Sequence, residues 1–150
     1  MDWPTVLRRI DDVLGSDKGR TAKAVRIAEL IRRAGGYGWV GLYEVTEEIA
    51  VLGWSGPGAP ADPRFAVTQG LSGAAVAASR AVVVNDVTAD PRYLTAFADT
   101  RSEAIVPVLD PGTGAVVGTL DVESTERDAF TDADRQALQR VAAASSGLFA

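Results

Sequence analysis

The chain contains no cysteine and no histidine among its 150 residues. Without cysteine it can form no disulfide, offer no thiolate nucleophile and hold no cysteine-ligated zinc or iron–sulfur cluster. Without histidine it lacks the side chain most often used for general acid–base catalysis and for binding transition metals. Both absences favour a binding protein over an enzyme.

Acidic side chains also outnumber basic ones. The chain has 15 lysines and arginines against 20 aspartates and glutamates, a net charge of −5. A negatively charged protein repels the phosphate backbone of nucleic acids and is not drawn to anionic membranes. No apolar run approaches the ~18 residues of a membrane span, and the N-terminus lacks an apolar signal segment. We therefore expect a cytoplasmic protein with neither nucleic acid nor membrane as a partner.

The sequence does contain clear helical and strand patterns. Apolar residues at helical spacing, with capping residues and alanine-rich stretches, predict four helices, over 3–14, 21–34, 71–79 and 131–146. Segments rich in β-branched and aromatic residues predict six strands, over 37–45, 48–54, 65–68, 81–85, 102–109 and 115–124. Adjacent hairpins imply an antiparallel sheet flanked by helices, which is the α+β class.

The length and the element order indicate one domain over residues 1–150. Its N-terminal helices span about 3–34, its sheet and pocket about 37–124, and its C-terminal helix about 131–146. Residues 55–63 are rich in proline and glycine, which is typical of a surface loop or lid. Residues 86–97 contain Asp90-Pro91, a pair that often starts a helix, so they are expected to form a short helix or a structured loop.

Aromatic and acidic side chains stand at alternating positions of the predicted strands. Because side chains alternate across a strand, Trp39 and Tyr43 share one face, and so do Asp121 and Glu123. Glu103 is the second residue of the strand predicted over 102–109. Two aromatic rings and three carboxylates that face one pocket would suit a ligand with an apolar end and an ammonium end. A small zwitterionic amino acid has that shape.

Two other interpretations of the acids are open. They could be the polar face of a half-solvated sheet, paired with basic residues such as Arg101 and Arg127. Clustered carboxylates also bind Ca²⁺ or Mg²⁺, because these ions take oxygen ligands without histidine. The chain has no aspartate-rich loop of the EF-hand type, so we expect no metal and no other cofactor.

Several motifs occur in an order that covers nearly the whole chain. They are WVGLY at 39–43, GLSGAA at 70–75, NDV at 85–87, SEAIVPV at 102–108, VGTLDVES at 117–124 and FTD at 130–132. Together they resemble the GAF domain superfamily, which implies an antiparallel sheet of about six strands flanked by helices. Within it the chain is most similar to the free methionine-(R)-sulfoxide reductases, which are single-domain enzymes that reduce the free amino acid with cysteine chemistry.

This resemblance implies a set of ligand-binding residues. In the family, a tryptophan and a tyrosine four residues apart surround the sulfoxide end of the substrate, and acidic residues hold its amino group. Trp39 and Tyr43 match the aromatic pair. Glu103, Asp121 and Glu123 match the acids by their place in the motifs. The pocket lining is therefore expected to be retained.

The reactive residues of the family are missing. Ser72 stands in place of the cysteine in the glycine-rich turn, and the cysteine of the irregular segment falls at Ala96 or beside it. A further family cysteine has no counterpart around Val82. Sulfoxide reduction by thiols proceeds through a sulfenic acid and a disulfide, and neither forms without cysteine. The resemblance thus implies the cavity without the reaction.

We predict a non-catalytic GAF domain that binds a small molecule, such as free methionine or methionine sulfoxide, in a sensory or regulatory role. One alternative is a cysteine-free enzyme related to the reductases, and another is a dimerization or interaction module whose pocket is filled by its own side chains. Terminal helices of GAF domains often pair between subunits, and the small residues 142–146 permit close approach. A homodimer is therefore predicted as well.

Overall fold

The computed structural model describes residues 1–95 and 97–150. Four α-helices and two short 3₁₀ helices occur in this part of the chain: α1 (Trp3–Leu14), α2 (Arg20–Gly35), α3 (Gly70–Ala78), η1 (Val87–Ala89), α4 (Asp132–Ala144) and η2 (Ser145–Phe149). The six strands are β1 (Trp39–Val45), β2 (Glu48–Ser55), β3 (Arg64–Ala66), β4 (Val82–Val84), β5 (Ser102–Leu109) and β6 (Val116–Ser124).

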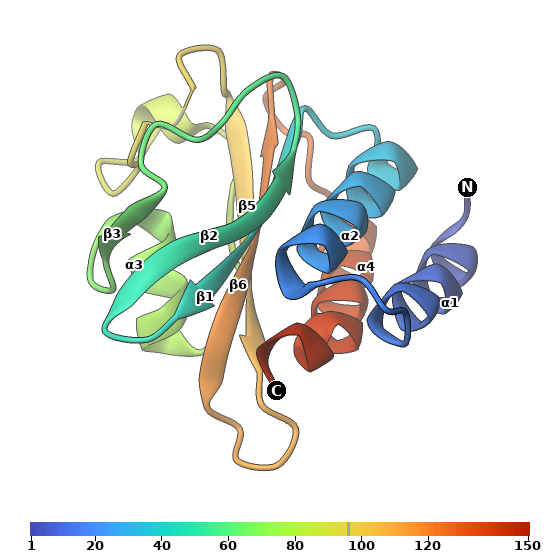
Figure 1. The fold of residues 1–150 in the computed structure, drawn as a ribbon. Coiled ribbons are helices and arrows are strands. Elements are labelled where there is room, and N and C mark those ends of the chain that lie inside the picture. Colours follow the sequence, from blue (N-terminus) through green and yellow to red (C-terminus); the bar gives the residue numbers. More distant parts are fainter. Residues whose placement is uncertain (96) are drawn as a thin grey trace.

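The strands form one antiparallel sheet in the order β3-β2-β1-β6-β5-β4 (Figure 1). Strands β1 and β6 are neighbours at the centre, where Trp39 lies opposite Glu123 and Gly41 lies opposite Asp121. Strand β5 pairs with the other side of β6 and places Glu103 opposite Glu123. The predicted α+β class and the six-stranded, helix-flanked sheet are confirmed.

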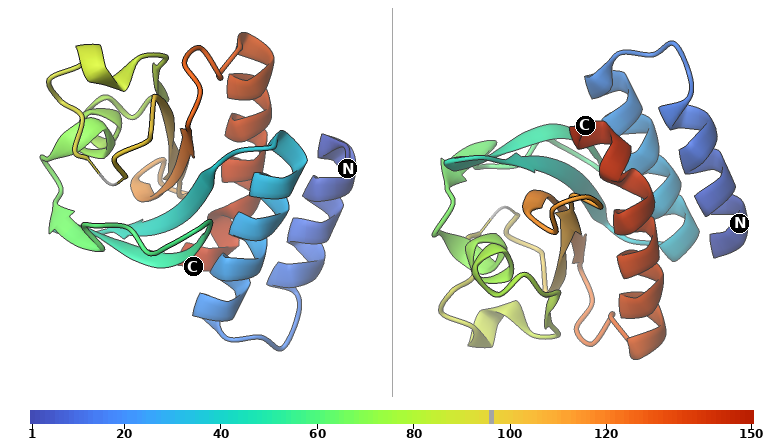
Figure 2. Two further views of the ribbon diagram at one scale, coloured as in Figure 1. Left: turned by 90° about the horizontal axis from the view of Figure 1, so that it is seen from above. Right: turned by 90° about the horizontal axis from the view of Figure 1, so that it is seen from below.

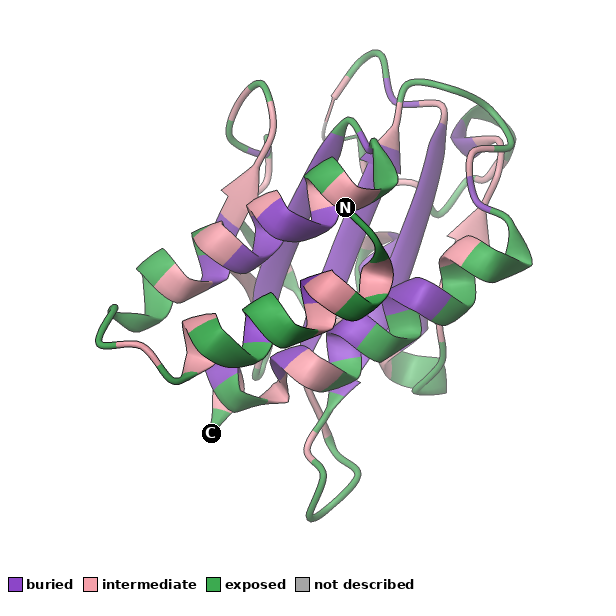
Figure 3. Ribbon diagram, turned by 90° about the vertical axis from the view of Figure 1, so that its right-hand side faces the viewer, coloured by how far each residue is buried: buried purple, intermediate pink, exposed green. Residues whose placement is uncertain are grey.

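The two faces of the sheet are covered differently. Helices α1, α2 and α4 form a layer on one face, whereas α3, η1 and the connecting loops lie on the other (Figure 2). The main hydrophobic core lies under the helical layer, where buried residues of the strands meet buried residues of the helices (Figure 3). Strand side chains in this core include Val40, Leu42, Val106, Leu120 and Val122, all fully or nearly fully buried.

Local sequence explains where the helices begin and end. The Asp2 carboxylate accepts a hydrogen bond from the Thr5 amide and caps α1, which has Pro4 in its first turn. Helix α2 ends at Gly35 and is followed by the capping residue Gly36, whose φ of 67° is the left-handed conformation that glycine adopts most easily. At the start of α4, Thr131 and Asp134 form a reciprocal capping box.

Residues 86–97 were expected to form either a short helix starting at Asp90-Pro91 or a structured loop, and the helix is not found there. Among the described residues of this segment, 86–95 and 97, only Val87–Ala89 is helical, as a short 3₁₀ turn, and Asp90-Pro91 begins no helix. The Asp90 carboxylate accepts a hydrogen bond from the Arg92 amide and also pairs with the Arg92 guanidinium at 2.7 Å, which stabilises a turn instead. The structured loop is therefore the correct alternative. None of the helices in the described residues has the length and apolar character needed to cross a bilayer.

Candidate functional site

The aromatic pair of β1 lies on the face of the sheet that the three long helices leave uncovered. Trp39 and Tyr43 are both buried, with ring centroids 6.3 Å apart. Between them on the same face is Gly41, where an added Cβ would lie 2.3 Å from Cη2 of Trp39. The indole therefore lies directly over Gly41, and a larger residue there would displace it.

The three predicted acids come together on the same face. Glu103, Asp121 and Glu123 are 5%, 6% and 1% exposed, and each offers a carboxylate oxygen within 4.8 Å of the others. The antiparallel register explains this, because Glu103 of β5 lies directly opposite Glu123 of β6. The alternation of β6 then puts Asp121 two residues away on the same face.

The acids are not the polar face of a half-solvated sheet. Their burial excludes that interpretation, and the expected basic partners are engaged elsewhere. Arg101 donates to the carbonyl oxygens of Ala98 and Thr100, and Arg127 lies 3.6 Å from the carboxylate of Asp86. No salt bridge within the described part of the chain includes Glu103, Asp121 or Glu123.

Burial and mutual repulsion disfavour the ionised form of all three groups. Burial, followed by the charges of Asp121 and Glu123, raises the pKa of Glu103 well above its ordinary value. Burial and the charge of Glu123 also raise the pKa of Asp121, although hydrogen bonding with Glu103 opposes the shift. Burial raises the pKa of Glu123, against hydrogen bonds that include one with Tyr93. Glu103 is therefore the group best placed to hold a proton.

Several buried oxygens at the site lack a partner. Oδ1 of Asp121, Oε2 of Glu123 and Oγ1 of Thr119 receive and make no hydrogen bond within residues 1–95 and 97–150. Thr119 stands on the same face of β6 as the two acids. Tyr93 donates its hydroxyl to Oε1 of Glu123 at 3.3 Å. Unpartnered buried acceptors are costly, and at a binding site a ligand can satisfy them.

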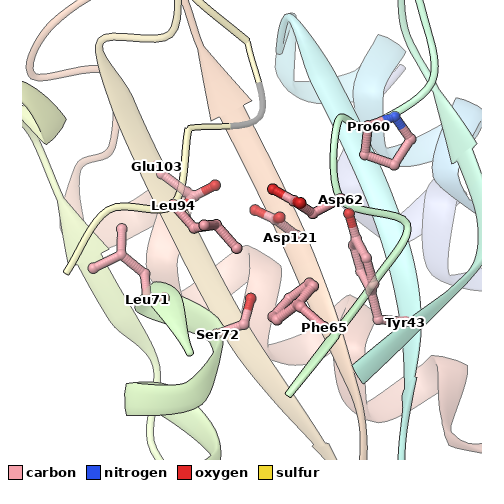
Figure 4. Close-up of a pocket in the computed structure, with 10 residues that line it drawn as sticks. Tyr43, Pro60, Asp62, Phe65, Leu71, Ser72, Leu94, Glu103 and Asp121 are labelled. Carbon is pink, nitrogen blue, oxygen red and sulfur yellow. The ribbon is translucent and has the colours of Figure 1, made fainter. Parts of the chain in front are cut away.

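A small cavity adjoins the acids (Figure 4). It measures about 30 Å³, the space of one water molecule. Asp121, Glu103 and Tyr43 line it from the sheet, and Ser72 lines it from the first turn of α3. Phe65, Leu71, Gly70 and the loop residues Pro60, Asp62 and Leu94 complete the wall. The loops therefore cover the site and leave little free volume.

Trp39 and Glu123 line a second cavity of about 30 Å³. The Trp39 indole donates its Nε1 hydrogen to the carbonyl oxygen of Gly58, and its ring centroid lies 5.5 Å from that of Phe97. The expected single pocket is thus divided. The five predicted residues share one face, but Tyr43, Glu103 and Asp121 border one cavity while Trp39 and Glu123 border the other.

The positions that correspond to the family's cysteines are partly visible. Ser72 is buried in the first turn of α3 and lines the main cavity, and Val82 is the first residue of β4. Ala96 lies outside the described residues. Sequence reasoning missed Tyr93, Asp62 and Leu94, because they belong to irregular loops whose path no local periodicity encodes.

Comparison with known proteins is consistent with this geometry. Residues 23–146 match the GAF domain family. The free methionine-R-sulfoxide reductase of Escherichia coli (strain K12) is 31% identical over 116 residues, which cover 77% of this chain and 68% of that protein. GAF domain-containing protein A of Dictyostelium discoideum is 23% identical over 141 residues, covering 93% of this chain and 87% of that protein.

Similarity extends to solved structures. Free methionine-R-sulfoxide reductase from Neisseria meningitidis, determined in complex with its substrate, superposes with a TM-score of 0.86 at 29% identity. The alignment covers 98% of this chain and 87% of that one. The resemblance seen in the sequence motifs is confirmed, and the chain belongs to the GAF domain family.

Proposed function

We propose that the chain is a non-catalytic GAF domain that binds a small molecule carrying an ammonium group, in a sensory or regulatory role. A free amino acid such as methionine or methionine sulfoxide is the first candidate. The observation that carries the proposal is the group of three buried carboxylates, Glu103, Asp121 and Glu123, with no arginine or lysine paired to them in the described residues. Buried negative charge of this kind calls for a cation.

An ammonium group suits the acids in charge and in hydrogen bonding. It has three donors and no acceptor, so it can bind one oxygen of each carboxylate, including the unpartnered Oδ1 of Asp121 and Oε2 of Glu123. The rings of Tyr43 and Phe65, whose centroids are 6.0 Å apart, offer contact area for an apolar body. Helix α3 begins at this cavity without a side-chain cap, so its first amides are available to an oxygen of the ligand.

Absence of cysteine supports binding without sulfoxide reduction. The similar reductases from Escherichia coli and Neisseria meningitidis act on free methionine-R-sulfoxide. A thiol route to that reaction passes through a sulfenic acid and a disulfide, and this chain has no sulfur that could form either. Ser72 adjoins the cavity, but among the described residues neither a lysine nor a histidine lines the cavity to activate it.

The cavity's small volume favours a second candidate, an interaction module whose hollow is filled by its own side chains. A space of about 30 Å³ is far below the ≈ 300 Å³ at which ligand pockets begin. An amino acid can enter only if the loops that carry Pro60, Asp62 and Leu94 move away. The two candidate functions therefore differ in whether a ligand can move these loops aside.

Titration calorimetry separates the two candidates. The full chain, freed of divalent ions with a chelator, is titrated with L-methionine, both methionine sulfoxides, other amino acids and simple amines. We expect at least one ammonium compound to bind, and Asp121→Asn to weaken it about 10- to 100-fold, because a charge-assisted hydrogen bond is lost. Asp17→Asn, an exposed aspartate in the α1–α2 connection, is the matched control and should leave affinity unchanged. Absence of binding by every compound would favour the filled module.

A further inference from the structure

The acid cluster has the composition of a site for a hard metal ion. Glu103, Asp121 and Glu123 contribute oxygen ligands only, and these oxygens lie within 4.8 Å of one another. Oxygen-only ligand sets suit calcium and magnesium, whereas zinc and copper prefer nitrogen and sulfur. No short motif encodes the set, because one acid comes from β5 and two from β6.

A second observation, independent of the clustering, is that buried oxygens of the cluster lack a hydrogen-bond partner, and a bound cation would supply one. Oδ1 of Asp121 and Oε2 of Glu123 are unpartnered within the described residues, and both side chains are more than nine-tenths buried. The Thr119 hydroxyl, fully buried on the same face of β6, is unpartnered as well. A structural carboxylate in the interior is normally paired with a basic group or fully hydrogen-bonded. These oxygens are neither.

Free volume and the number of protein ligands distinguish between the two hard ions. Calcium binds oxygen at about 2.3–2.6 Å, so ligands on opposite sides of the ion are about 4.6–5.2 Å apart, and three oxygens that all lie within 4.8 Å of one another can surround one such ion. Magnesium binds at about 2.0–2.1 Å and keeps several of its waters. The adjoining cavity of about 30 Å³ has room for about one. Three carboxylates, each able to bind through both oxygens, can instead supply up to six calcium ligands.

We propose that Glu103, Asp121 and Glu123 bind a calcium ion when no organic ligand occupies the site. A single ion fits without movement of the covering loops, in contrast to an amino acid. This proposal rests on the acid cluster and its unpartnered buried oxygens, and it does not depend on the organic ligand proposed above. Because both cations use the same oxygens, calcium and the ammonium compound exclude each other.

Calcium binding is measured on the full chain after removal of divalent ions with a chelator that is then dialysed away. Calorimetric titration with calcium chloride should give one site per chain. Terbium, which takes the place of calcium in oxygen sites, should show luminescence excited through Trp39 and Tyr43, because both rings are buried beside the acids. Excess calcium should abolish this luminescence, and magnesium should do so only at concentrations at least ~10-fold higher.

Two isosteric variants assign the site. Asp121→Asn and Glu123→Gln each remove one charge without changing the shape of the side chain, and each should weaken calcium binding at least ~10-fold. Thermal unfolding with a chelator present verifies that both variants are folded. Asp17→Asn is again the control and should bind as the wild type does. Lack of calcium heat and of terbium luminescence in the wild type would overturn the proposal, and so would unchanged affinity in both variants.

The same titrations separate this proposal from the proposed function. Calcium binding that depends on Asp121, with no amino acid or amine bound under chelator, supports the ion site and contradicts the organic ligand. Binding of an ammonium compound under chelator, with no calcium binding, contradicts the ion site alone. If both bind, calcium must raise the apparent dissociation constant of the ammonium compound. Simultaneous binding without competition would overturn the shared site.

Discussion

At the scale of single residues, the acids of the site form an unequal set. Hydrogen bonding with its neighbours raises the pKa of Glu103, as burial and charge also do, whereas hydrogen bonding with Glu103 lowers the pKa values of Asp121 and Glu123 against the effect of burial. Glu103 is thus the group of the three that favours the protonated form, and its single hydroxyl can donate to only one of the other two at a time. A bound cation would replace this proton, so cation binding is expected to release protons to the solvent.

Replacing this ionisable group should stabilise the cation-free protein. With a chelator present near neutral pH, we expect Glu103→Gln to raise the free energy of unfolding on the order of 1–2 kcal/mol, because an amide enters the interior without the cost of protonating or burying a carboxylate. Urea unfolding measures this, with Asp17→Asn as the exposed control. If the wild type is as stable as Glu103→Gln, other interactions already offset the cost of burying the acids.

The dependence on pH has a definite sign. The pKa of Glu103 is raised in the folded state, so the folded protein holds more protons than the unfolded chain, and the free energy of unfolding should fall as pH rises above the ordinary glutamate pKa. Tyr93 and Asp99 also act on the pKa of Glu123, and Asp62 acts on the pKa of Tyr43. None of these groups carries a positive charge, so none opposes the fall in stability. In Glu103→Gln the slope should be smaller.

Gly41 tests the packing of the aromatic pair. An added Cβ would lie 2.3 Å from the Trp39 ring and 3.1 Å from that of Tyr43, so Gly41→Ala should displace the indole and cost about 1–3 kcal/mol of stability. Near-ultraviolet circular dichroism should change with it. Gly112→Ala in the β5–β6 turn, where the closest atom would be 3.6 Å away, is the control and should be nearly neutral. Equal effects of the two substitutions would exclude a specific contact with Trp39.

At the scale of elements, regular periodicity predicted most of the fold. The apolar spacing of residues 3–14 and the cap at Asp2 predicted α1 with the boundaries that the structure has. Strand alternation also predicted that Trp39 and Tyr43 share one face of their strand, and that Asp121 and Glu123 share one face of theirs. The pairing of β1 with β6 brings these two faces to the same side of the sheet. No local sequence pattern specifies that pairing.

Irregular segments set the limit of prediction. Asp90-Pro91 matched a helix start, but the Asp90–Arg92 pair competes with the helix and closes a turn. The loop that supplies Pro60 and the one that supplies Leu94 cover the acids and divide the hollow. Their paths depend on tertiary contacts, so neither the burial of the acids nor the small cavity could be predicted from sequence.

The capping box of α4 provides a test at this scale. Thr131 and Asp134 satisfy each other's backbone amides, and Asp134 also accepts a hydrogen bond from the Tyr37 hydroxyl at 2.9 Å. Thr131→Ala should cost about 1 kcal/mol, and Asp134→Ala more, because the Tyr37 contact is lost too. Urea denaturation measures both. Asp132→Ala, at an exposed position of the first turn, should cost less.

A double-mutant cycle verifies the link from Asp134 to the core. Tyr37→Phe should remove the additional cost of Asp134→Ala, so the two substitutions together should cost less than their sum. Burial alone would raise the pKa of Asp134, but hydrogen bonds from Thr131 and Tyr37 outweigh it and lower the pKa. The contribution of Asp134 should therefore be present above the ordinary carboxyl pKa and be lost as pH falls below it. Additive costs would contradict the coupling.

At the scale of the whole molecule, the large hydrophobic core and the proposed binding site lie on opposite faces of the sheet. The large core packs between the sheet and α1, α2 and α4, while the acids lie on the other face between two small hydrophobic clusters. One cluster is built around Trp39 and Tyr43, and the other around Leu71 and Ile105. Substitutions of the acids should therefore change binding without unfolding the protein.

Homodimerization stays a prediction, and the structure makes it specific. The exposed side of α1 carries Arg8 and Arg9 one turn before Asp11 and Asp12. If α1 packs antiparallel against its copy about a two-fold axis, these basic and acidic pairs lie opposite each other. Large hydrophobic residues that are exposed in the described chain are few, namely Met1, Val25 and Leu109, so such a dimer must depend on charge and weaken with salt.

Sedimentation equilibrium at low and high salt tests the pairing. The wild type should sediment as a dimer at low ionic strength, and its dissociation constant should rise as salt is added, since exposed ion pairs are screened. Replacing Arg8 and Arg9 by glutamate places four acids on each α1 and should give monomers. Adding Asp11→Arg and Asp12→Arg to that variant reverses both signs, restores the complementarity and should restore the dimer. A monomer mass for the wild type at high concentration would contradict the prediction. A dimer that forms equally well in the wild type and in both variants would show that the interface does not involve this side of α1.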